Sequence, residues 1–124
     1  MEMIGKAMCI TKEMIKEWHD LTGGTNPIHI DTKLAMRQGF KGPVAHGDLL
    51  FILALETFCN TYLNLTQNAV EMDAKFIRPV CAGDTIEIWI ELANKEKVKN
   101  FEIRVDGRPA VVGKILNCSI DDMF

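Results

Sequence analysis

The sequence predicts an α+β fold, in which one long buried helix packs against an antiparallel sheet. Residues 46–63 are apolar on nearly every side, which is typical of a buried helix. Farther along, apolar and polar side chains alternate over 86–92 and over 101–105, as they do in half-buried strands. A chain of 124 residues with 48% hydrophobic side chains can bury a core of its own. We therefore expect one domain that spans residues 1–124.

The first elements expected along the chain are a strand over 4–10 and a helix over 12–21. Thr11 is suited to cap the start of this helix, because its hydroxyl can accept a hydrogen bond from a free backbone N–H. Gly23 and Gly24 end the helix. Its apolar side carries Met14, Ile15, Trp18 and Leu21 at helical spacing.

A turn and a short helix are expected next. Proline fixes its own φ and keeps the preceding residue out of the helical region, so Asn26-Pro27 predicts a turn. Asp31 can then cap a helix that runs to Gln38 and that Gly39 ends.

The remaining segments complete the sheet. Residues 70–78 predict a strand, which Pro79 ends. Asp106-Gly107 is a strong signal for a tight hairpin, and it leads into a strand over 109–120. Together with the two alternating segments, these strands supply a sheet that can curl around the long helix.

Two loop segments carry the residues best suited to chemistry. His29 follows the Asn26-Pro27 turn, which holds an imidazole at a defined place on a loop. Gly47 opens the long helix, where free backbone N–H groups favour an oxygen that gains negative charge. A base and an oxyanion-binding helix start are two parts of a site that processes thioesters.

These segments resemble the signature of the MaoC-like hydratase/dehydratase family, the (R)-specific enoyl-CoA hydratases of the hot-dog fold. A second matching motif runs over 76–85, and the resemblance spans about residues 5 to 120. It implies a long central helix wrapped by a curled antiparallel sheet, and a homodimer or higher homo-oligomer with the substrate tunnel at the dimer interface. An outer Trp89 also suggests pairing. The residues that match the first motif are Gly23, Asn26, Pro27, His29, Asp31, Pro43, His46 and Gly47.

The main departure from the family is Gly24, which stands where the family has its catalytic aspartate. A glycine carries no proton, so His29 would act alone, a nearby acid would replace the aspartate, or hydration would be lost. Asp48 is the natural replacement because it directly follows His46-Gly47, although an acid in a first helical turn also suits the helix dipole. The volume left free at Gly24 could instead hold a bulkier acyl group.

The resemblance also implies roles for the other site residues. His29 is expected to activate water, and Asn26 to orient water or substrate, or only to shape the turn. The N–H of Gly47 is expected to polarise the thioester carbonyl. Gly24 and His46 are assigned to substrate binding together with Gly47, and His46 is also expected to bond to loop backbone.

Three functions remain open. The first is reversible addition of water to a 2-enoyl-CoA or acyl-carrier thioester, which gives an (R)-3-hydroxyacyl thioester. The second is a hot-dog protein without activity that binds acyl thioesters or supports an active partner subunit. The third is an acyl-CoA thioesterase, for which Asp48 or Glu56 would supply a carboxylate. None of the three implies a cofactor.

Charge, cysteine spacing and hydropathy argue against other classes. A net charge of −3 does not suit a nucleic-acid binder, and the four cysteines are too widely spaced for a metal site or a disulfide framework. The longest apolar run, 49–55, is far shorter than the ~20 residues of a membrane span, and no signal peptide is visible. We therefore expect a cytoplasmic protein with no membrane or nucleic-acid partner. Lys41, Lys75 and Arg78 are weak candidates for the phosphates of coenzyme A.

Overall fold

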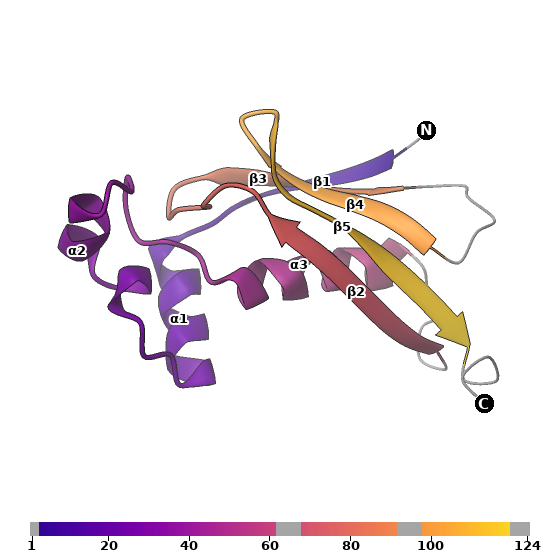
Figure 1. The fold of residues 1–124 in the computed structure, drawn as a ribbon, viewed down its shortest axis with the longest axis horizontal. Coiled ribbons are helices and arrows are strands. Elements are labelled where there is room, and N and C mark those ends of the chain that lie inside the picture. The colour runs from indigo at the N-terminus through magenta and orange to yellow at the C-terminus, as the bar shows by residue number, and fades with distance from the viewer. Residues whose placement is uncertain (1–2, 62–67, 92–97, 120–124) are drawn as a thin grey trace.

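Five antiparallel strands form one sheet that curves over a long helix (Figure 1). In this computed structural model, residues 3–61, 68–91 and 98–119 are described. The strand order is β1-β3-β4-β5-β2, so β1 and β2 form the two edges. The strands are β1 (Met3–Cys9), β2 (Asn68–Phe76), β3 (Thr85–Glu91), β4 (Val98–Val105) and β5 (Arg108–Ser119). The predicted α+β hot-dog architecture is thereby confirmed.

The helices lie beneath the sheet and at one of its ends (Figure 1). The long helix α3 (Gly47–Thr61) lies beneath the sheet, whereas α1 (Lys12–Thr22) and α2 (Thr32–Arg37) lie together beyond its end (Figure 1). A short 3-10 helix, η1 (Pro27–His29), connects α1 to α2. Because α1, η1 and the start of α3 meet at this end, the loop residues singled out by the sequence are brought together there.

The core lies between α3 and the inner face of the sheet. The alternation predicted for β3 is confirmed from Ile86 to Ile90, since Ile86, Ile88 and Ile90 are fully buried and Glu87 and Trp89 are only partly buried. It breaks at Glu91, which is 3% exposed and accepts hydrogen bonds from Asn100. The other large side chains of the core include Phe101 and Ile103 of β4, and Leu49, Leu50, Leu53 and Phe58 of α3.

The helix α3 is not covered on every side within the chain. Its prediction as a helix is confirmed, but Ile52 is exposed, and Phe51 and Leu55 are only partly buried. Although α3 is apolar on nearly every side, the described residues leave a strip of its apolar side chains uncovered. The predicted last residues, 62 and 63, lie outside the described residues.

The predicted caps and turn are confirmed. The hydroxyl of Thr11 accepts a hydrogen bond from Met14 N at 3.1 Å, and the carboxylate of Asp31 accepts one from Leu34 N at 3.0 Å. Between β4 and β5, Asp106 and Gly107 have φ values of 53° and 75°. Positive φ at both central residues is what a type I′ hairpin turn requires. Gly23, with φ 69°, ends α1 as predicted.

The inner face of α1 differs from the prediction. Leu21 was expected to face inward, but its side chain is 80% exposed. His19 is buried instead, at 6% exposure, together with Ile15 one helical turn earlier. A spacing of four residues keeps Ile15 and His19 on one side of the helix. Thus a histidine, rather than a leucine, extends the inner face of α1.

Two further expectations are corrected or limited by the structure. Strand β2 ends at Phe76 rather than at Arg78, because the N–H groups of Ile77 and Arg78 both bond to Ala110 O as the chain leaves the sheet. Residues 92 and 120, expected at the ends of β3 and β5, lie outside the described residues.

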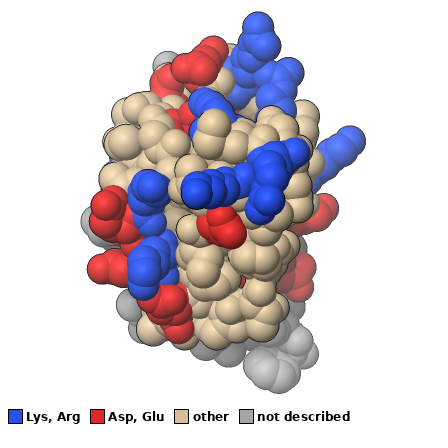
Figure 2. Space-filling view, turned by 90° about the vertical axis from the view of Figure 1, so that its left-hand side faces the viewer, with Lys and Arg blue, Asp and Glu red and all other residues tan. Residues whose placement is uncertain are grey.

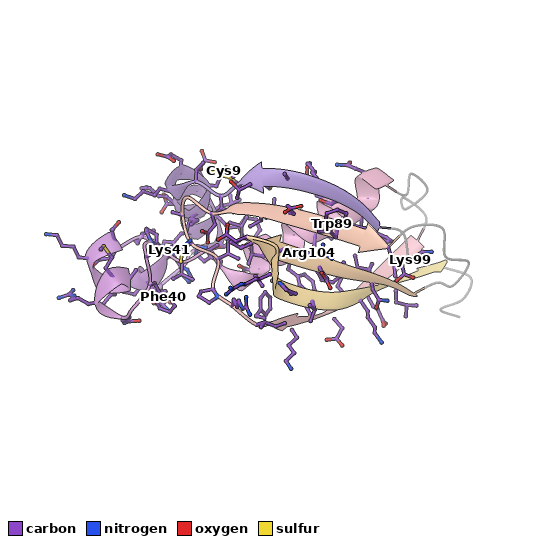
Figure 3. All side chains as sticks on the ribbon, turned by 90° about the horizontal axis from the view of Figure 1, so that it is seen from above. Cys9, Phe40, Lys41, Trp89, Lys99 and Arg104 are labelled. Atoms are coloured by element: carbon purple, nitrogen blue, oxygen red, sulfur yellow. The ribbon has the colours of Figure 1, made fainter. Side chains whose placement is uncertain are left out.

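Trp89 is covered within its own chain. The guanidinium carbon of Arg104 lies 4.9 Å from the Trp89 ring centre, and Figure 3 shows the two side chains together on the outer face of the sheet. A Cβ placed on Gly5 of the neighbouring strand would lie 3.1 Å from the same indole, so the ring packs directly on β1. Trp89 is therefore weaker evidence for contact with a second copy of the chain than the sequence suggested.

Candidate active site

His29 is held with one ring nitrogen engaged and the other available. Asn26 starts η1 by accepting a hydrogen bond from Ile28 N at 3.1 Å, which places His29 at the end of this short helix. The Nδ1 atom of His29 lies 2.6 Å from Val44 O. A carbonyl oxygen can only accept, so Nδ1 carries the proton, and Nε2 of the neutral ring has a free lone pair. That is the tautomer a general base needs.

Asn26 has a local structural role in this arrangement. Its carboxamide shapes the turn, which was one of its two expected roles. Within the described residues, the Asn26 side chain makes no hydrogen bond to His29 or to another site residue. A role for Asn26 in orienting water or substrate stays a prediction.

The segment that faces His29 is fixed from two sides. Val44 N donates to Ile28 O at 3.2 Å, and Ala45 N donates to Val80 O at 2.7 Å. Val44 also pairs with Cys81 in an isolated antiparallel bridge. The segment before α3 is therefore held between η1 and the chain near residue 80, which defines the position of the His29 ring.

Three imidazoles meet at the start of α3. His46 precedes α3, and its ring stacks on that of His29 with centres 3.6 Å apart and planes inclined by 21°. On its other side, His46 Nε2 lies 3.1 Å from His19 Nδ1. The centres of the His19 and His29 rings are 5.9 Å apart. We call His19, His29 and His46 the histidine cluster.

His46 differs from the expectation that it bonds to loop backbone. Within the described residues, the one hydrogen bond of its ring is to the His19 side chain, and its Nδ1 is buried without a partner. Burial lowers the pKa of His46, and positive charge on His29 and then on His19 lowers it further, whereas Asp48 opposes the shift. The cluster therefore disfavours the positively charged form of His46, its central ring.

Gly24 is required because His19 occupies the adjacent space. A Cβ at position 24 would lie 2.3 Å from His19 Nδ1 and 2.6 Å from Cε1, distances at which the ring would have to move. The backbone of Gly24 is not in the left-handed region, which Gly23 does occupy. Space, rather than backbone conformation, thus explains the glycine. The volume expected to be free for an acyl group is filled by this imidazole.

Asp48 lies near the histidine cluster but is engaged elsewhere. It stands in the first turn of α3, and its Oδ1 accepts a hydrogen bond from Trp18 Nε1 at 2.9 Å. Its charge acts on His46, where it raises the pKa against the effect of burial. This arrangement favours the electrostatic role that was weighed for Asp48.

An apolar groove adjoins the start of α3. It has a volume of about 380 Å³, and Val44, whose carbonyl holds His29, lines it together with Gly47. A Cβ on Gly47 would lie 3.2 Å from the Phe76 ring, so glycine lets this ring approach the helix start. The first N–H groups of a helix have no partner within the helix. The groove is also lined by Phe40, Ala45, Leu50, Phe76, Ile77, Arg78, Pro79 and Val80.

The end of the molecule that carries α1 and α2 has a mixed surface charge, with acidic side chains among the lysines and arginines (Figure 2). A second groove, of about 450 Å³, is lined by Arg78 and Arg108 as well as by Lys41. Lys41 forms an ion pair with the buried Asp84, which reduces its value for binding a phosphate. Arg78 is therefore a better candidate than Lys41, while Lys75 lines a separate groove.

Neither a metal site nor a membrane span is found in the described part of the chain. No group of His, Cys, Asp and Glu side chains there is arranged to hold a metal ion, the histidine cluster included. None of the described helices has the length and hydrophobicity of a membrane-spanning segment.

Solved structures of hydratases have a similar fold. The (R)-hydratase of A. caviae involved in PHA biosynthesis has a TM-score of 0.75 and 21% identity, over 95% of this chain and 94% of that one. The R-hydratase PhaJ1 of Pseudomonas aeruginosa has a TM-score of 0.76 and 22% identity, over 95% and 79% of the two chains. At these identities the likeness shows the fold alone.

A dehydratase complex has a similar fold. The HadBC (3R-hydroxyacyl-ACP dehydratase) complex of Mycobacterium tuberculosis contains a chain with a TM-score of 0.76 and 17% identity, over 90% of each chain. A search of the curated proteins found no significant match. The model of the MaoC-like domain matches residues 4–112, which is most of the sequence. The chain therefore belongs to the MaoC-like domain family.

Proposed function

We propose that the protein catalyses the reversible addition of water to a 2-enoyl thioester, which gives an (R)-3-hydroxyacyl thioester. The observation that carries this proposal is the state of His29. Its Nδ1 is tied to Val44 O, so Nε2 is free to accept a proton from water. The loop that holds it leads directly into Gly47 at the start of α3, beside an apolar groove.

In the proposed reaction, backbone N–H of Gly47 polarises the thioester carbonyl. This withdraws electrons from the Cα–Cβ double bond, so that water can attack Cβ. The helix start supplies partial positive charge for the enolate oxygen that develops. The apolar groove lined by Leu50 and Phe76 is suited to the acyl chain. The thioester is carried by coenzyme A or by an acyl carrier protein.

We also propose that the protein works as a homodimer. Phe76 and Ile77 are exposed at the end of the edge strand β2, and Phe76 is 50% exposed although it is a large aromatic side chain. Ile52 is exposed on the uncovered strip of α3. A second copy would bury such apolar surface. Sedimentation equilibrium at micromolar concentration tests this proposal, and a monomer would contradict it.

A single assay separates hydration from the other functions. Purified protein is incubated with crotonyl-CoA and with longer 2-enoyl-CoA esters, while enoyl absorbance and free thiol are followed in parallel. Hydration lowers the absorbance without releasing thiol, whereas a thioesterase releases thiol. If neither signal changes while the protein still binds butyryl-CoA in calorimetry, the protein is a binding module and the hydratase proposal is wrong.

A further inference from the structure

Hydration needs two proton-handling groups, and the site offers imidazoles for both. Water must lose a proton to a base, and Cα must gain one from an acid. His29 is suited to the first task. Two carboxylates interact with the histidine cluster, and both are engaged: Asp48 accepts a hydrogen bond from the indole of Trp18, and Asp20 is paired with Lys16. The acid therefore has to be sought within the cluster itself.

Access to the ring nitrogens separates the two remaining histidines. His46 uses Nε2 to bond with His19, and its Nδ1 is sealed from solvent without a partner. His46 therefore has no nitrogen that can reach a substrate. His19 uses only Nδ1 in that hydrogen bond. Within the described residues, its Nε2 is neither bonded nor among the buried atoms that lack a partner.

The location of His19 suits the acid that protonates Cα. Its ring fills the volume next to Gly24, so any longer side chain at position 24 is excluded by this imidazole. Its ring centre is 5.9 Å from that of His29, so the two rings border the same region of the site. We infer that His19 is the general acid of the reaction and that His29 is the general base. This inference rests on the proposed hydration.

The proposed reaction of His29 and His19 balances in protons. The oxygen of water forms a bond to Cβ while the water proton passes to His29 Nε2, and the π electrons move toward the thioester carbonyl. The enolate then takes a proton at Cα from Nε2 of the His19 imidazolium. His29 ends with one extra proton and His19 with one fewer, and a proton transfer from His29 to His19 through solvent restores the starting state. The net result is addition of one water.

In this scheme His46 is a positioning residue. Its Nε2 can accept the hydrogen bond from Nδ1–H of His19 both before and after His19 gives up its Nε2 proton. Its ring also stacks on His29, so one buried imidazole orients both reacting groups. The lowered pKa of His46 helps to keep it in the neutral form that this acceptor role requires.

The first arm of the test measures activity and pH dependence. Variants His19→Ala and His19→Asn should lose about 10²–10⁴-fold in kcat, since asparagine can keep a hydrogen bond to His46 but carries no proton for Cα. Glu17→Ala, exposed on the same helix, is the matched control. In wild-type protein, kcat/KM should fall at both low and high pH. The titratable groups that face His19 are Asp20 on its own helix and the rings of His29 and His46, while the charge of Asp48 acts on His46.

The second arm of the test moves the acid from position 19 to position 24. Gly24→Asp alone should lower activity, because the new side chain meets the His19 ring. The double variant His19→Ala/Gly24→Asp should be at least tenfold more active than either single variant. The high-pH limb of its pH profile, which reports loss of the acid's proton, should lie at lower pH, since a carboxylic acid ionises at lower pH than an imidazolium. A purely structural role of His19 would not produce this rescue and shift.

The third arm does not depend on activity. Gly24→Ala should lower the melting temperature of the wild-type protein but have little effect in the His19→Ala background. Equal effects in both backgrounds would show that His19 does not occupy this space. If this thermal coupling is found but wild-type protein hydrates no enoyl-CoA, the proposed function and the acid role both fail, while the position of His19 stands. If wild-type protein is active and His19→Asn keeps more than half of kcat, only the acid role is overturned.

Discussion

Trp18 Nε1 donates a hydrogen bond to Asp48 Oδ1 at 2.9 Å, which ties α1 to the first turn of α3. This contact joins the two helices that carry or follow His19 and His46. It also fixes the orientation of the carboxylate that the sequence offered as a substitute acid.

The first prediction follows from this contact. Asp48→Asn should reduce turnover far less than the 10²–10⁴-fold expected for loss of a general acid, because an amide oxygen can still accept from the indole. Stability should fall by less than about 1 kcal/mol, which is the usual value of an acid near a helix start. Steady-state kinetics and thermal unfolding check both values. A 100-fold loss of kcat with normal stability would make Asp48 the acid.

The second prediction concerns the base. His29→Ala should reduce kcat/KM by about 10²–10⁴-fold, because it removes the ring whose Nε2 is proposed to accept the proton of water. The melting temperature should stay close to that of the wild type, since His29 is only partly buried at the end of the short helix η1. Lys16→Gln on the exposed side of α1 is the control. Unchanged turnover in a folded His29→Ala variant would remove this residue from the mechanism.

The third prediction links His46 to the pH dependence of stability. Burial lowers the pKa of His46 in the folded protein, so the unfolded chain takes up a proton at higher pH than the folded chain does. The free energy of unfolding should therefore decline as pH falls below about 6.5, the usual histidine value, and the contribution should be fully present above it. Chemical unfolding at a series of pH values measures this slope.

The control for this effect is His46→Asn, which keeps the two neighbouring rings of His19 and His29. Its stability should depend less steeply on pH between neutrality and pH 5 than that of the wild type. An equal slope in both proteins would show that His46 is not protonated more readily in the unfolded chain.

The fourth prediction concerns the turn before β3. Asp84 is buried, accepts a hydrogen bond from Cys81 N at 2.9 Å and pairs with Lys41. Asp84→Ala should cost about 1–3 kcal/mol, because it leaves a buried N–H without its acceptor. Lys41→Ala should cost less than about 1 kcal/mol, because the Lys41 side chain is 63% exposed and its ion pair is accessible to water. Denaturant unfolding compares the two, and equal losses would contradict this division.

Most of the fold could be predicted because its signals are local. Asp106-Gly107 specifies a hairpin turn through its own backbone preferences, and Thr11 and Asp31 cap helices through contacts three residues away. The alternation in β3 likewise predicted which side chains are buried from Ile86 to Ile90, although not the burial of Glu91. The exposed strip of α3 could not be read from its sequence, because an apolar side chain does not say whether its own chain or another one covers it.

The candidate site was predicted only in part, because its main contacts join side chains from separate elements of the chain. The motif identified His29, Gly24 and His46, but the space beside Gly24 is filled by a side chain from α1. The available signal was the four-residue spacing from Ile15 to His19, which competed with the more hydrophobic Leu21. Hydrophobicity favoured leucine, whereas hydrogen bonding to His46 offsets the cost of burying an imidazole.

The most direct test of the proposed reaction is the destination of the water oxygen. The protein is incubated with crotonyl-CoA in water enriched in ¹⁸O, and the products are analysed by mass spectrometry. Hydration predicts one ¹⁸O atom in the hydroxyl at Cβ of an intact (R)-3-hydroxybutyryl thioester, with His29→Ala strongly reduced. Label in a free carboxylate, or no labelled product from the wild-type protein, would contradict the account.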